Sequence, residues 1–70
     1  MNLDKIIKMK LIQLSSKYDI SLIEISKVKD GMVKSVFNFS YQLLEDEDAE
    51  KHCETFSSKR KLVSWLVWLE

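Results

Sequence analysis

The chain has 70 residues, with no proline, one glycine and one cysteine, and its 11 basic and 11 acidic side chains cancel. This length suits a single domain over residues 1–70, which buries only about 60% of its unfolded surface. The lone Cys53 excludes a disulfide framework and favours a reducing, cytoplasmic location. We expect no signal peptide, and no apolar run in this sequence is long enough to span a bilayer.

Charge is unevenly distributed along the chain. Residues 1–29 carry a net charge of plus three, residues 45–56 carry minus five, and residues 57–70 carry plus two. An acidic segment therefore lies between two basic ones.

Residues 3–18 are predicted to form the first helix. Apolar residues recur at spacings of three and four, at Leu3, Ile7, Leu11, Leu14 and Tyr18. Asn2 is the candidate N-cap. Met9 and Ile12 fall off the main stripe, which we interpret as a wide core face, with contact to a partner as the alternative.

Residues 20–44 are predicted to form a β-hairpin that turns at Asp30-Gly31. Side chains alternate on both sides of this dipeptide, which favours a two-residue turn. The expected pairs are Val28 with Val33, Ser26 with Ser35, Glu24 with Phe37, Leu22 with Phe39, and Ile20 with Tyr41. The alternative is a helix-turn-helix, because Ser21 to Glu24 fits a capping box.

Four consecutive acids, Glu45 to Asp48, predict a solvated turn after the hairpin. Residues 50–56 favour a third strand, since two strands alone rarely form a stable sheet. A short helix over the same residues is the alternative.

Residues 59–69 are predicted to form the last helix, capped by Ser57 or Ser58. Leu62, Leu66 and Leu69 form its apolar stripe, and Val67 and Trp68 point elsewhere. A buried strand over residues 62–69 is the alternative. The predicted fold is α+β, in the order α-β-β-β-α, with a small antiparallel sheet packed on two helices.

The sequence offers no combination of residues typical of a catalytic, metal or cofactor site. His52 and Cys53 are adjacent, so on a strand they point to opposite faces and cannot act together. We expect a surface histidine and a half-buried cysteine. There is no glycine-rich phosphate loop. We therefore interpret the chain as a non-enzyme without a cofactor.

Two features favour binding to a partner protein. The first is the acidic set Glu45, Asp46, Glu47, Asp48 and Glu50, which complements a basic surface; the alternative is a solubilising turn. The second is the Val67 and Trp68 pair, since exposed tryptophan is enriched at interfaces; the alternative is a helix buried on two sides.

The order α-β-β-β-α, with Ser58, Lys59 and Arg60 opening the last helix, resembles the double-stranded RNA-binding domain. That family grips phosphates with a Ser-Lys-Lys cluster at this position. The resemblance implies RNA binding through Lys59, Arg60 and Lys61. Against it, the acids from Glu45 to Glu50 would repel RNA.

The general character of the chain is also similar to small phage-encoded inhibitors of the anti-CRISPR type, some of which place acidic patches in nucleic-acid sites. The leading hypothesis is therefore a small inhibitor that binds a larger nucleic-acid-handling protein. A degenerate RNA-binding domain and a homodimer closed by the C-terminal apolar surface are the alternatives.

Overall fold

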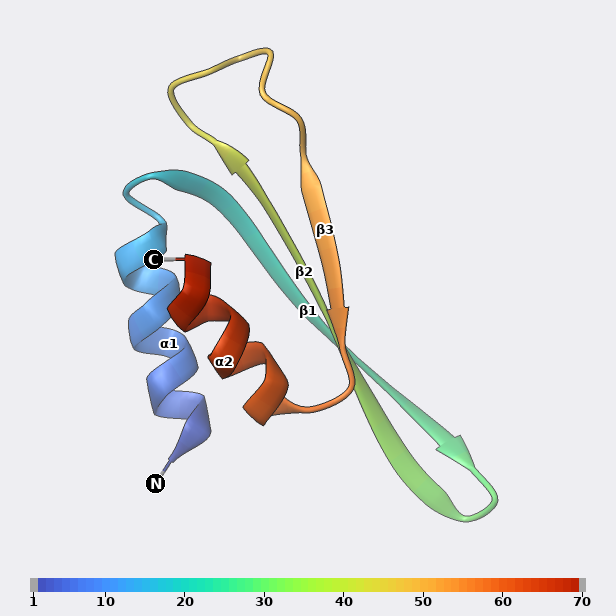
Figure 1. Ribbon diagram of the computed structural model, residues 1–70. Coiled ribbons are helices and arrows are strands. Elements are labelled where there is room, and N and C mark those ends of the chain that lie inside the picture. The colour runs from blue at the N-terminus through green and yellow to red at the C-terminus, as the bar shows by residue number, and fades with distance from the viewer. Residues whose placement is uncertain (1, 70) are drawn as a thin grey trace.

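The fold of the protein is a three-stranded antiparallel sheet with two helices. The computed structural model describes residues 2–69, which form α1 (Leu3–Leu14), β1 (Tyr18–Lys29), β2 (Met32–Leu43), β3 (His52–Phe56) and α2 (Lys59–Leu69) (Figure 1). The sheet order is β1-β2-β3. The predicted α+β class and the order α-β-β-β-α are confirmed, and the helical and strand alternatives for individual segments are wrong.

The β1–β2 hairpin has the predicted register throughout. Every expected pair is present, from Val28 opposite Val33 to Ile20 opposite Tyr41. Asp30 has φ 53° and Gly31 has φ 76°. A two-residue turn with positive φ at both positions matches the right-handed twist of paired strands, which explains why this dipeptide sets the register.

The first helix ends earlier than predicted. Tyr18 does not extend α1 but is the first residue of β1. The Ser15 hydroxyl donates to the Ile12 carbonyl at 2.7 Å, and the Ser16 hydroxyl donates to the Gln13 carbonyl at 3.0 Å. Serine hydroxyls that bond to the backbone compete with helix propagation, so the chain leaves the helix here.

Both helices lie against one face of the sheet, next to one another (Figure 1). The buried core consists of apolar side chains from α1, β2 and α2: Ile7, Leu14, Phe37, Phe39, Leu62 and Leu66. Leu62 and Leu66 are fully buried and Leu69 is half-buried, which confirms the predicted stripe of α2.

The expectation of a wide core face on α1 is wrong. Met9 and Ile12 are 56% and 64% exposed. The structure has two layers, and no described element lies on the outer side of the helices. A helix in such an arrangement buries only one stripe.

The starts of the two helices are capped and joined. The Asn2 side-chain oxygen accepts from the Asp4 N–H at 3.1 Å, as predicted. Ser58, one of the two predicted caps, accepts from the Lys61 N–H at 3.2 Å. The Lys59 ammonium and the Asp4 carboxylate lie 2.6 Å apart, so they link α2 to α1.

Only part of the hairpin is covered. β3 pairs with β2 over Phe37 to Tyr41, and the rest of the hairpin is a two-stranded ribbon that extends beyond the helices (Figure 1). Val28 and Val33 in this ribbon are 75% and 69% exposed. No helix in residues 2–69 is long and apolar enough to cross a membrane.

Candidate functional site

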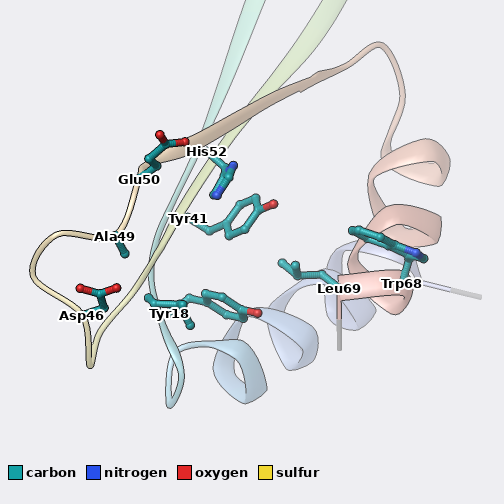
Figure 2. A pocket seen from close by; sticks show the side chains of 9 residues that line it. Tyr18, Tyr41, Asp46, Ala49, Glu50, His52, Trp68 and Leu69 are labelled. Atoms are coloured by element: carbon teal, nitrogen blue, oxygen red, sulfur yellow. The ribbon is translucent and has the colours of Figure 1, made fainter.

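An open groove of about 440 Å³ lies between the β2–β3 connection and the end of α2. Figure 2 shows its lining, in which two tyrosine rings lie between the acidic connection and the end of the helix. The lining residues are Tyr18, Tyr41, Leu43, Asp46, Ala49, Glu50, His52, Trp68 and Leu69. Pockets that bind small groups in proteins commonly have volumes of about 300–1,000 Å³.

Aromatic rings form the floor of this groove. The ring of Tyr41 lies edge-on to Tyr18 at 5.4 Å between centroids and stacks on His52 at 4.9 Å. Burial raises the pKa of the Tyr41 hydroxyl above 10.0, and the negative charge of Glu54 and the interaction with Tyr18 raise it further. The Tyr41 ring in the floor therefore stays uncharged at neutral pH.

The acidic side of the groove is held by hydrogen bonds within the β2–β3 connection. The Gln42 side-chain amide donates to the Ala49 carbonyl at 2.6 Å, which anchors the connection to β2. The Asp46 carboxylate accepts a hydrogen bond from the Asp48 N–H at 3.0 Å, and the backbone carbonyl of Asp46 accepts one from the Ala49 N–H at 3.1 Å. These bonds place Asp46 and Glu50 along the groove.

The opposite side of the groove is the last turn of α2. Trp68 is 74% exposed, although its ring centroid lies 6.1 Å from that of Trp65. Trp68 projects away from the core because it lies two residues past Leu66, about 200° around the helix. The alternative in which α2 is buried on two sides is therefore wrong.

The structure brings together only some of the partner-binding residues predicted from the sequence. Asp46 and Glu50 share the groove with Trp68, whereas the remaining members are exposed and lie outside its lining: Glu45, Glu47, Asp48 and Val67. The aromatic floor of the groove, formed by Tyr18 and Tyr41, was not identified from the sequence. The predicted pairing of Ile20 with Tyr41 was the available signal, because it places residue 18 beside Tyr41 on the same sheet face.

The basic cluster predicted for the RNA-binding alternative lies at the start of α2, away from this groove. Lys59 is bonded to Asp4, and this bond raises the pKa of the Lys59 ammonium. The Lys61 ammonium donates to the Ser57 hydroxyl at 3.2 Å. Arg60 and Lys61 line a second open groove of about 630 Å³, whose lining also includes Trp68.

His52 and Cys53 lie on opposite faces of β3, as predicted, since His52 pairs with Tyr41 and Cys53 with Ser40. Cys53 is exposed, so the expectation of a half-buried thiol is wrong. It lies on the sheet face that no helix covers. Among residues 2–69, no three His, Cys, Asp or Glu side chains are placed to hold a metal ion.

The chemistry of the first groove suits a cation. Aromatic faces attract ammonium and guanidinium groups, and carboxylates beside them add direct charge pairing. Trp68 and Leu69 provide apolar surface next to that position. Comparison of the chain with protein-family models, curated proteins and solved structures gave no significant match.

Proposed function

We propose that this protein is a non-enzymatic interaction module whose groove receives a lysine or arginine side chain of a larger partner protein. The Asp46 and Glu50 carboxylates neutralise the cation above the tyrosine floor, where the Lys17 ammonium of this chain lies 5.3 Å from the Tyr18 ring centroid. Trp68 contacts an apolar residue that adjoins the cation. Tryptophan, tyrosine and arginine are the residues that most often dominate binding energy at protein interfaces.

The observation that carries this proposal is the convergence of three separate segments on one groove. The acidic connection, the sheet floor and the end of α2 are far apart in the sequence, yet Glu50, Tyr41 and Trp68 line the same surface. Exposed apolar surface beside charge of one sign is typical of protein docking sites.

The most concrete form of the proposal is an inhibitor of a nucleic-acid-handling protein, of the anti-defence or anti-CRISPR type. Such partners present lysine and arginine side chains to hold phosphate groups. The segment 45–56, with a net charge of minus five, would compete for those side chains. We place this activity in the cytoplasm, because a single free thiol suits a reducing compartment.

The test uses a short fluorescent peptide that alternates arginine and leucine, and two double variants that remove the same charge. Asp46→Asn with Glu50→Gln changes the groove, and Glu45→Gln with Glu47→Gln changes the same segment outside it. We expect the first pair to weaken binding about tenfold, since two exposed charge pairs that contribute about 0.7 kcal/mol each add up to about 1.4 kcal/mol. The second pair should change affinity by less than about twofold.

If the two double variants weaken peptide binding equally, the overall negative charge of the segment explains the attraction. That result would overturn the groove as the binding site. A further control replaces arginine in the peptide by the uncharged citrulline, which should abolish binding to the unmodified protein. Retained binding of the citrulline peptide would contradict the role of the cation.

The alternative function is binding of double-stranded RNA through Lys59, Arg60 and Lys61, which the order of elements favours. A gel-shift titration at low salt tests it. RNA binding that falls steeply with salt and is lost in Arg60→Glu would support this alternative and reject the inhibitor proposal.

A further inference from the structure

The outer edge of β1 is the longest unpaired backbone in the described part of the chain. β1 has 12 residues and is an edge strand of the sheet, whereas β3, at the other edge, has only five. Its pairing with β2 runs through all 12 residues without a bulge. Proteins usually interrupt such edges with proline, bulges or very short strands, and an uninterrupted edge is a template for another strand.

The hydrogen-bond phase of β1 determines which residues face this open edge. The Leu44 N–H donates to the Lys17 carbonyl at 3.1 Å, which continues the β1–β2 ladder by one pair. Bonded positions alternate in an antiparallel ladder, so the odd-numbered residues of β1 bond to β2. The backbone groups of the even-numbered residues, Tyr18 to Val28, therefore point outward. If the second strand is β1 of another copy, its own even-numbered residues must form the hydrogen bonds with these outward-facing groups.

We propose that two copies of this chain pair antiparallel through their β1 edges, with Ile23 opposite Ile23 of the second copy. In this register Asp19 lies opposite Lys27 of the other copy, and Lys27 lies opposite Asp19, on the sheet face that no helix covers. Ile25 lies diagonally beside the other Ile23. The exposed Ile23 and Ile25, 56% and 38% accessible, thus cover each other across the junction.

Charge selects this register over its neighbours. Moving the centre by one residue toward the turn places Glu24 opposite Glu24, a like-charge pair. Moving it the other way places Asp19 opposite Ile25, which leaves the carboxylate against an apolar side chain. Of these three registers, only the one centred on Ile23 gives two reciprocal ion pairs without opposing like charges within residues 18–28; Lys29 meets Lys17 of the second copy at the two ends of the junction.

The isolated chain leaves these two charges without partners. Lys27 lies directly opposite Lys34 in β2, and Asp19 lies opposite the uncharged Gln42. Neither Asp19 nor Lys27 takes part in an ion pair within residues 2–69. The Asp19 carboxylate of a second copy would offset the repulsion between the two lysines. This surface shares Tyr18 with the groove, but neither Asp19 nor Lys27 lines the groove, so variants at these two residues test it independently of the proposed function.

The test is sedimentation analysis of the full chain and of charge-reversal variants. We expect a dimer for the unmodified protein, and a dissociation constant raised about tenfold or more for Asp19→Lys and for Lys27→Asp, since each change creates two like-charge contacts. The double variant Asp19→Lys with Lys27→Asp should restore dimerisation. A monomer at all concentrations, or a double variant no better than the single ones, would overturn the proposal.

Disulfide trapping checks the register in a Cys53→Ser background. Ile23→Cys should form an interchain disulfide under mild oxidation, because opposite residues in a non-hydrogen-bonded pair have Cα atoms about 4.5 Å apart, within disulfide range. Ile25→Cys is the matched control and should cross-link far less, because Ser21 lies opposite it. Equal cross-linking of both variants, or rescue of Asp19→Lys by Lys29→Asp, would overturn this register.

Discussion

The two tryptophans of α2 should make very different contributions to stability. The ring of Trp65 lies 5.4 Å from Phe39, 5.3 Å from Tyr41 and 5.6 Å from Phe56 between centroids. Truncating a tryptophan with such contacts costs about 3–5 kcal/mol. Because Trp65 is half-buried, we expect Trp65→Ala to lower the free energy of unfolding by about 3 kcal/mol, the lower end of that range.

Trp68 is 74% exposed, so only about a quarter of its surface is covered. A quarter of ~250 Å² at ~25 cal/mol per Å² gives about 1.5 kcal/mol. Alanine is the better helix former by roughly 0.5 kcal/mol, which leaves a net cost of about 1 kcal/mol for Trp68→Ala.

Urea denaturation followed by far-ultraviolet circular dichroism measures both variants without using tryptophan fluorescence. The predicted difference between them is about 2 kcal/mol. If Trp68→Ala lowers the free energy of unfolding as much as Trp65→Ala, Trp68 is a core residue. Its side chain would then not be available for binding, which would refute this reasoning.

Three further predictions concern pH, the turn and a helix cap. The raised pKa values of the Tyr41 hydroxyl and the Lys59 ammonium mean that the unfolded chain loses these protons first. The free energy of unfolding should therefore be insensitive to these groups below about pH 10 and fall as pH rises above it; Tyr41→Phe should make the fall shallower in urea titrations. Gly31→Val should lower the free energy of unfolding by about 1–2 kcal/mol. The cost comes from the positive φ alone, since a Cβ added at Gly31 would meet no atom within 4 Å. A loss of stability no larger than that of an exposed strand substitution would contradict this. Ser58→Ala should lower stability by about 1 kcal/mol and Ser57→Ala by less, because only Ser58 accepts a backbone N–H of α2; equal losses would contradict the assignment of the cap.

The hairpin was predictable because its information is local. Asp30-Gly31 fixes the turn, and the period-two alternation then fixes every pair, down to Leu22 opposite Phe39. The last helix was predictable for the same reason, since Leu62 and Leu66 recur at helical spacing and both are fully buried.

The groove could not be predicted in full, because it depends on how separate elements meet. Asp46 and Trp68 were identified from their own segments, but their approach depends on the twist of the sheet and the path of the β2–β3 connection. Apolar periodicity places Tyr18 in the helix, because this residue continues the apolar stripe of α1. The serines at 15 and 16 end that helix through hydrogen bonds to the backbone, which apolar periodicity does not register.

NMR of the amide and indole N–H resonances during titration with the arginine–leucine peptide tests whether the groove binds a cationic side chain. We expect saturable shifts at the groove residues, above all the Trp68 indole and the backbone of Glu50 and His52. We expect no comparable shifts at Arg60 and Lys61 in the second groove or in the hairpin ribbon. Shifts spread evenly over the acidic segment, with the Trp68 indole unmoved, would contradict binding in the groove.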